Sequence, residues 1–116
     1  MGYRSFEELD VWKLGCNLAV RVYEALKDCK DFGLKDQMTR AAVSISSNIA
    51  EGAERNSKQE FIRFLHIAKG STAELRTQIY IACKIGIIDN SVQKEFAEEL
   101  KKISSMLHSL IKSIKT

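Results

Sequence analysis

The sequence predicts an all-α fold, an antiparallel up-down-up-down four-helix bundle. Its 116 residues contain no proline and only six glycines, so strong helix breakers and common turn residues are scarce. Apolar residues recur at helical spacing in four blocks of roughly 20 to 30 residues, and only short links separate these blocks. Four such helices pack most simply as a bundle. The length predicts one domain, residues 1–116, large enough to form an ordinary hydrophobic core.

The first two predicted helices span residues 6–30 and 34–54. Ser5 and Glu8 resemble a capping box at the start of the first helix, and Gly33 interrupts the apolar pattern between the two. We expect each helix to turn one apolar stripe toward the core. The stripes consist of Trp12, Leu14, Leu18, Val22, Ala25 and Leu26 in the first helix, and of Met38, Ala41, Ala42, Ile45, Ile49 and Ala53 in the second.

The third and fourth predicted helices span residues 57–86 and 90–115. Ser57 followed by Glu60 is a clear capping box, and Asp89 or Asn90 can cap the fourth helix. The apolar steps of four and three in the third helix are typical of coiled-coil-like packing. The stripes consist of Phe61, Leu65, Ala68, Thr72, Leu75, Ile79 and Ala82, and of Val92, Phe96, Leu100, Ile103, Leu107, Leu110 and Ile114.

The segment SISSNIAEG, residues 44–52, places weak helix formers inside a predicted helix. The short link that follows makes the second and third helices an antiparallel hairpin, in which facing positions should sum to about 112. That register sets Ala41 and Ala42 beside Gly70 and Ser71. Small residues would then meet across the interface, and the two helices could approach to about 8 Å.

Two glycines and one amide stand out in this hairpin. Gly52 and Gly70 lie mid-helix, where each costs about 1 kcal/mol relative to alanine, so we expect a neighbour to need the space they leave. Asn48 falls on the inward line and must find hydrogen-bond partners. One interpretation is structural, as in coiled coils where such a residue fixes register. The other is a ligand-facing or subunit-facing role together with Glu51 and Arg55, which are spaced as an i, i+4 pair.

The net charge of +3 is too small to establish a nucleic-acid partner, but its distribution is uneven. Residues 101–116 contain four lysines and no acidic residue. Cations at a helix C-terminus are the ordinary explanation, and a surface that faces phosphates is the alternative. The lysines are Lys101, Lys102, Lys112 and Lys115.

The sequence favours a cytoplasmic protein that does not enter a membrane. Cys16, Cys29 and Cys83 are odd in number and lack CxxC spacing, as expected of reduced thiols. The first ten residues have no apolar core of a secretory signal, and no apolar run is long enough to span a bilayer.

Nothing in the sequence predicts an enzyme, a metal site or a cofactor site. His66 and His108 have no histidine or cysteine at i+3 or i+4, and Glu-x-x-His pairs are absent. Phosphate-binding glycine loops and the nucleophile-elbow motif are absent as well. Arg63 and His66 are separated by two residues, too few for the Arg-x(4–6)-His motif of some helical ribonucleases.

Two stretches, SFEELDVWK and QMTRAAVSISSNIAEGAERNSKQEFIRFLHIAKGSTAELRTQIYIACKIGII, closely resemble the 23S rRNA-intervening-sequence protein family, over about residues 5–88. The chain departs from the family pattern in the first connector, where a Phe-Pro pair usually stands and this chain has residues 29–32. The most specific matching positions are Ser44, Ile45, Asn48, Ile49, Ala50, Glu51, Gly52, Arg55, Glu60, Phe61, Phe64, Leu65, Ala68, Gly70, Ser71, Glu74 and Leu75.

The resemblance implies a non-enzymatic bundle that assembles as a homo-oligomer, with a five-membered ring favoured and a dimer next. Family members are encoded in inserts of bacterial large-subunit rRNA genes or stand alone. A similar protein is an accessory factor of diversity-generating retroelements, thought to bind nucleic acid and a reverse transcriptase. We therefore expect a ring that offers basic surface to RNA or DNA. The alternative is a protein-interaction scaffold whose partner is a protein such as a reverse transcriptase.

Overall fold

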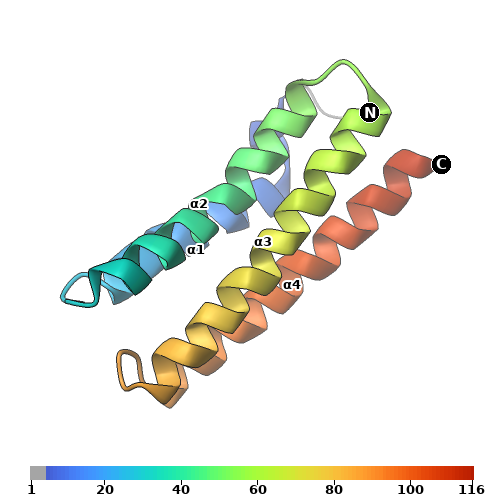
Figure 1. Ribbon diagram of the computed structural model, residues 1–116. Coiled ribbons are helices and arrows are strands. Elements are labelled where there is room, and N and C mark those ends of the chain that lie inside the picture. Colours follow the sequence, from blue (N-terminus) through green and yellow to red (C-terminus); the bar gives the residue numbers. More distant parts are fainter. Residues whose placement is uncertain (1–4) are drawn as a thin grey trace.

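The computed structural model describes residues 5–116 and confirms the predicted all-α, four-helix fold (Figure 1). A single turn of 3₁₀ helix precedes the four α-helices. The elements are η1 (Phe6–Glu8), α1 (Asp10–Ala25), α2 (Phe32–Glu54), α3 (Lys58–Lys84) and α4 (Asn90–Lys115). The first helix is thus shorter than the expected range 6–30, because its apolar pattern begins in a separate turn and ends before the polar segment that follows Leu26.

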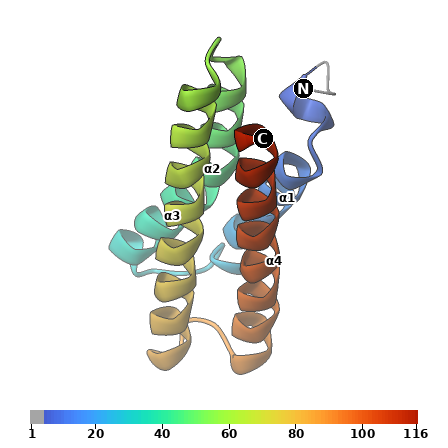
Figure 2. The same ribbon diagram turned by 90° about the vertical axis from the view of Figure 1, so that its right-hand side faces the viewer.

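Each helix packs against its neighbours in the chain, and α1 also contacts α4, which closes the bundle. The links α1–α2 and α3–α4 lie at one end of the molecule, whereas the α2–α3 link and the C-terminus lie at the other (Figure 1). The body measures 44 × 21 × 20 Å. Figure 2 shows that α3 and α4 run side by side, and no described segment crosses in front of them in that view.

Side-chain caps explain where three of the helices begin. The Ser57 hydroxyl accepts a hydrogen bond from the Glu60 amide at 3.2 Å, as the capping box predicts. Asp89 caps α4 through the Val92 amide, and Asp31 caps α2 in the connector that departs from the family pattern. Ser5 instead accepts from the Glu7 amide, so it starts a 3₁₀ turn rather than a capping box with Glu8.

One hydrophobic core includes residues of all four helices and matches most of the predicted stripes. The predicted inward residues of α3 are all buried. Ala25 is exposed, contrary to expectation, because α1 ends there. Trp12 packs against the core only partly, and Ile111 of α4 is buried although the predicted stripe passed over it.

Two glycines allow neighbouring helices to approach closely. A Cβ atom on Gly52 would lie 2.6 Å from the Cβ atom of Phe64 in α3, and one on Gly15 would lie 2.4 Å from the Ser46 hydroxyl oxygen in α2. Gly70 is different, since it is exposed and nothing lies within 4 Å of a Cβ atom built on it. The expectation that Gly70 faces a neighbour within this chain is therefore wrong.

The polar residues of the 44–52 segment also contact neighbouring helices. The Ser44 hydroxyl donates to the Ser71 hydroxyl at 2.7 Å, within about one helical turn of the predicted register. On the other side of α2, the Ser46 hydroxyl donates to the Trp12 carbonyl of α1 at 3.1 Å. Weak helix formers stand in this segment because small, hydroxyl-bearing side chains fit between closely packed helices and form hydrogen bonds with the neighbouring helix.

An arginine that no sequence motif singled out joins the first and last helices. The Arg21 guanidinium forms ion pairs with Glu99 and, at 3.2 Å, with Glu95 of α4. Its central carbon also lies 5.6 Å from the centre of the Phe96 ring. These contacts hold two of the acidic side chains of α4 on its α1 side.

Candidate nucleic-acid interface

The four lysines singled out in the last helix are all exposed on α4. Lys101 and Lys102 lie in the middle of the helix, whereas Lys112 and Lys115 lie in its last turn. They extend over about 21 Å of helix axis rather than gathering at one helix end. At about 100° per residue, Lys102 alone falls on a different side of the helix from the other three.

No ion pair within residues 5–116 neutralises these lysines. The acidic residues Glu95 and Glu99 of α4 bind Arg21 on the side that faces α1. The second half of α4, from residue 101 onward, carries no carboxylate side chain. No carboxylate side chain of this part of α4 therefore offsets the positive charge of the four lysines.

A groove of about 450 Å³ lies between α3 and α4. It is lined by one of these lysines and by two residues that no sequence pattern predicted as site residues. Arg76 and Tyr80 of α3 line it opposite Lys101 and Gln93 of α4. The Tyr80 side chain is 55% exposed, and the Lys84 ammonium lies 5.5 Å from its ring centre. The groove thus combines cations, amide and hydroxyl groups and an exposed aromatic ring, with no acidic residue among those that line it.

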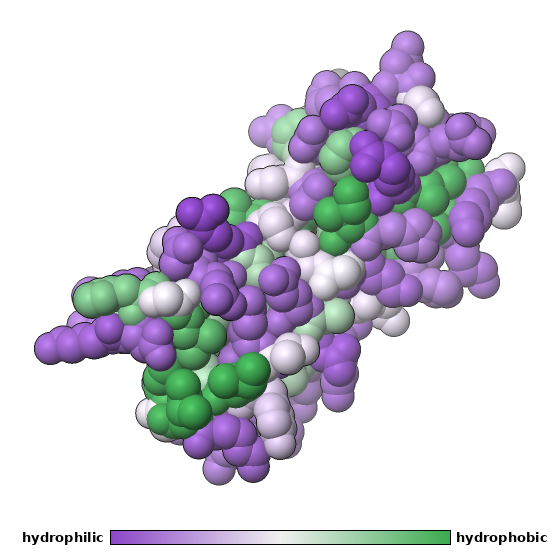
Figure 3. Space-filling model, viewed as in Figure 1, coloured by the Kyte–Doolittle hydropathy of each residue, from purple (hydrophilic) through white to green (hydrophobic). Residues whose placement is uncertain are grey.

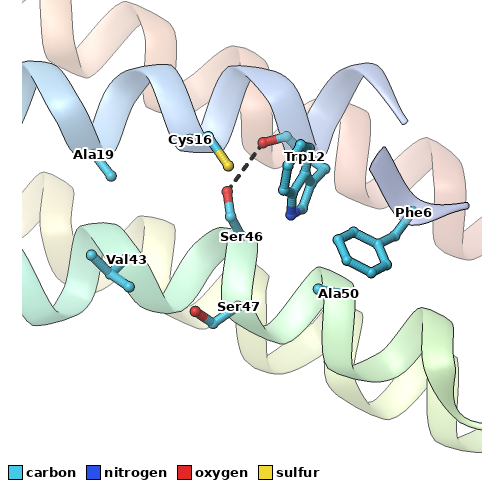
Figure 4. Close-up of a pocket in the computed structure, with 8 residues that line it drawn as sticks. All are labelled: Phe6, Trp12, Cys16, Ala19, Val43, Ser46, Ser47 and Ala50. Atoms are coloured by element: carbon cyan, nitrogen blue, oxygen red, sulfur yellow. Dashed lines mark hydrogen bonds between the residues drawn. The ribbon is translucent and has the colours of Figure 1, made fainter. Parts of the chain in front are cut away.

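A second pocket, of about 350 Å³, lies between η1, α1 and α2 and is largely apolar (Figure 4). Figure 4 shows Phe6 and Trp12 near one end of the pocket and Ala19 and Val43 near the other. The two aromatic rings meet edge to face, 5.4 Å apart between centres. The hydroxyl of Ser46 is already bound to the Trp12 carbonyl. No charged side chain lines this pocket and most of its lining is apolar, so it offers mainly hydrophobic contact.

Both histidines are exposed, and neither forms a hydrogen bond or ion pair within the described part of the chain. Arg63, which is close to His66 in sequence, instead binds Glu60 through two hydrogen bonds of 2.9 and 3.2 Å. This contact lowers the pKa of the Glu60 carboxyl and raises the pKa of the Arg63 guanidinium. Both groups are fully ionised near neutral pH and serve as a salt bridge on one turn of α3.

Neither a metal-binding cluster nor a membrane-spanning helix occurs within residues 5–116. No group of three or more histidine, cysteine or acidic side chains in this range could hold a metal ion together. The four α-helices are each too short or too polar to cross a membrane.

Comparison with known proteins shows to which family the chain belongs. The family model of the 23S rRNA-intervening sequence protein matches residues 7–109. The chain belongs to this family. A crystal structure of a protein of unknown function from the S23 ribosomal protein family of Bacteroides thetaiotaomicron is similar, with a TM-score of 0.82 and 26% sequence identity. The alignment covers 88% of this chain and 98% of the other. None of the curated proteins matches this chain.

Four of the residues that carry the resemblance to the 23S rRNA-intervening sequence proteins hold α2 against α3, namely Ser44, Gly52, Phe64 and Ser71. Ser71 is buried and accepts from Ser44, and Gly52 lies against Phe64. Asn48 is only half buried, and its amide nitrogen donates to the Ser44 carbonyl one turn earlier at 2.7 Å. The expectation of an inward amide is thus met in part, since Asn48 is satisfied within its own helix.

Two more of these family residues flank the α2–α3 link. Arg55 forms an ion pair with Glu51 at 3.1 Å, as the i, i+4 spacing predicts. The guanidinium carbons of Arg55 and Arg63 lie 5.0 and 4.4 Å from the centre of the Phe64 ring. The family residues Arg55 and Phe64 therefore form an aromatic-arginine cluster with Arg63 at this end of the bundle.

Two further family residues, Gly70 and Glu74, are exposed on α3. Glu74 lines a shallow groove beside α2 together with Arg40 and Ser44. Arg40 already forms an ion pair with Asp36 at 2.9 Å, and Glu74 forms none within the described residues. Within residues 5–116, no hydrogen bond, ion pair or close contact of Gly70 or Glu74 accounts for its presence in the motif.

Proposed function

We propose that this protein is a non-enzymatic, self-associating bundle that acts in the cytoplasm and binds RNA or DNA through the basic surface of α4. One observation carries the proposal. Residues 101–116 contain four exposed lysines and no Asp or Glu. Phosphate contacts through such lysines give affinity without sequence preference. Arg76 extends the same surface onto α3.

Self-association supplies the affinity that one subunit lacks. A net charge of +3 on 116 residues gives weak attraction to a polyanion, whereas symmetric repetition multiplies the contacts. We propose a homo-oligomer, with a five-membered ring favoured and a dimer next. Exposed apolar side chains on α3 support an association surface, because Ile81 and Ile85 lie one turn apart and are 44% and 57% exposed. Hydrophobic atoms gather near the end where α3 leads into α4 (Figure 3).

The same apolar surface favours the second candidate function, a scaffold for another protein such as a reverse transcriptase. A third exposed isoleucine, Ile67, precedes Ile81 by four helical turns on the same side of α3. Exposed isoleucines along one helix mark a surface for protein contact rather than for phosphates. This candidate requires no nucleic-acid affinity.

Fluorescence anisotropy with structured RNA and with duplex DNA, titrated across salt concentrations, tests the proposal. We expect binding at about 50 mM salt that weakens steeply as salt rises, with similar slopes for different sequences. If the protein binds neither RNA nor DNA at that salt concentration, the proposed nucleic-acid function is excluded and the scaffold takes its place.

A further inference from the structure

The α1–α2 pocket, the α2–α3 groove and the α3–α4 groove differ in their lining. Only the α3–α4 groove combines an exposed aromatic ring with cations that form no ion pair within residues 5–116. The α1–α2 pocket has Phe6 and Trp12 but no charged residue. The α2–α3 groove has Arg40 and Glu74 but no aromatic residue. The α3–α4 groove has Tyr80 together with Arg76 and Lys101. The chemistry of this groove therefore differs from that of a generally basic surface.

The position of Tyr80 suits contact with a flat ring. Its side chain is 55% exposed, although it lines a groove of about 450 Å³, a volume within the range of about 300–1,000 Å³ that small-ligand sites occupy. Ala73 and Ala97 line the same groove and leave space, because neither side chain extends beyond Cβ. A planar group can therefore lie against the phenol ring without displacing a large side chain.

One cation lies beside this ring, and two more line the groove. Lys84 lies 5.5 Å from the ring centre, and Arg76 and Lys101 line the groove. None of the three forms an ion pair within residues 5–116. Aromatic rings that stack on bases, interleaved with cations that follow the phosphates, are the combination by which proteins bind single strands.

We propose that the α3–α4 groove binds single-stranded RNA or DNA, with an unpaired base stacked on Tyr80 and the flanking phosphates held by Arg76, Lys84 and Lys101. This inference rests on the proposed nucleic-acid function and narrows it to a substrate class. A base in a duplex is already stacked on both faces, so it cannot enter the groove unless it leaves the helix. Duplexes would contact the lysines of α4 and Arg76 through phosphates alone, with no base stacked on Tyr80.

Anisotropy of a labelled oligothymidylate of about 12 nucleotides, compared with a duplex of the same length at low salt, tests this inference. Tyr80→Ala should weaken single-strand binding by roughly five- to 150-fold, the range found for loss of one stacked base, and should leave duplex binding unchanged. Tyr80→Phe keeps the ring and should bind the single strand nearly as well as the wild type. Tyr23→Ala is the matched control, since Tyr23 is 51% exposed on α1, away from the groove.

The outcomes separate the inference from the proposed function. If the wild type binds the duplex as tightly as the single strand and Tyr80→Ala weakens neither, base stacking is wrong while phosphate binding by α4 stands. If the wild type binds neither probe, the proposed function fails and the inference fails with it. A loss that Tyr23→Ala reproduces would also overturn the role of Tyr80. Circular dichroism of each variant shows whether the helices are intact.

Discussion

Gly52 of α2 lies so close to Phe64 of α3 that a Cβ atom on the glycine would be 2.6 Å from the Cβ atom of the phenylalanine. The Phe61 carbonyl oxygen would lie 3.3 Å from the same added atom. Backbone and Cβ atoms cannot yield as the end of a flexible side chain can. This contact sets the distance between the two helices at the end of the bundle where their link lies.

Gly52→Ala should therefore destabilise the protein, by about 1–3 kcal/mol, because the added methyl group forces α2 and α3 apart. The gain in helix propensity from alanine offsets part of this loss. Chemical denaturation followed by circular dichroism measures the change in the free energy of unfolding.

Gly70→Ala is the matched control, and its expected effect on the free energy of unfolding is opposite in sign. Nothing lies within 4 Å of a Cβ atom at Gly70, so alanine there should stabilise α3 by about 0.5–1 kcal/mol. Destabilisation by Gly70→Ala would contradict this expectation and would indicate that a second subunit packs against Gly70.

The contrast between these glycines shows what the sequence could and could not predict. Periodicity placed the four helices, and the hairpin register brought Ser44 within a turn of its true partner, Ser71. Register gives the height of a residue along a helix but not the side on which it lies. Gly70 falls outside the stripe that contains Ala68 and Thr72, so that stripe could have shown that Gly70 is exposed.

The candidate site was harder to predict because it joins two helices. The exposure of the four lysines on α4 follows from their places between the apolar residues of that helix. Arg76 and Tyr80 line the same groove as Lys101 only because of the register of α3 against α4. The turn after α3 sets that register, where Gly86 adopts a φ of +84° and the Ile87 amide bonds back to the Ala82 carbonyl at 2.8 Å.

The pairing of Arg21 with Glu99 should stabilise the contact between α1 and α4. Glu99 is only 19% exposed, so this charged hydrogen bond is partly shielded from water. A double-mutant cycle with Arg21→Gln and Glu99→Gln should give a coupling energy of about 1–2 kcal/mol in urea denaturation. The same cycle on Arg40 and Asp36, which are 79% and 61% exposed, should give less than about 0.5 kcal/mol. Equal coupling in the two cycles would show that burial does not strengthen the Arg21 contact.

Asp89 should make the stability of the protein depend on pH in the acidic range. The hydrogen bond from the Val92 amide, supported by the Ser91 hydroxyl, lowers the pKa of the Asp89 carboxyl in the folded state. The stabilisation is therefore present above the unfolded-state pKa of about 3.9 and is lost as the pH falls through the lower folded-state value. Asp89→Asn keeps the cap but removes the charge, so its melting temperature should fall less between about pH 5 and pH 2 than that of the wild type. Identical acid profiles would exclude Asp89 as a source of the pH dependence.

The protein should not be a monomer in solution. One chain has a mass of 13.1 kDa, and the exposed isoleucines of α3 are costly to leave in water. Light scattering coupled to size-exclusion chromatography should report a multiple of this mass, five-fold for the favoured ring. A mass of one chain across the accessible concentration range would exclude self-association, and the multivalent binding proposed above would lose its basis.

Replacing Lys101, Lys102, Lys112 and Lys115 together by glutamine should weaken nucleic-acid binding and reduce its dependence on salt. Each lysine that binds a phosphate adds about 0.7 to 0.9 to the slope of log affinity against log salt concentration, so the slope should become shallower when these lysines are replaced. The fold should persist, because all four side chains are exposed. The matched control replaces Lys13, Lys27, Lys30 and Lys58, which are also exposed and lie outside α4. Both variants lose four positive charges, so net charge alone affects them equally. If the control variant loses as much affinity as the α4 variant, binding depends on overall charge and α4 is not the nucleic-acid interface.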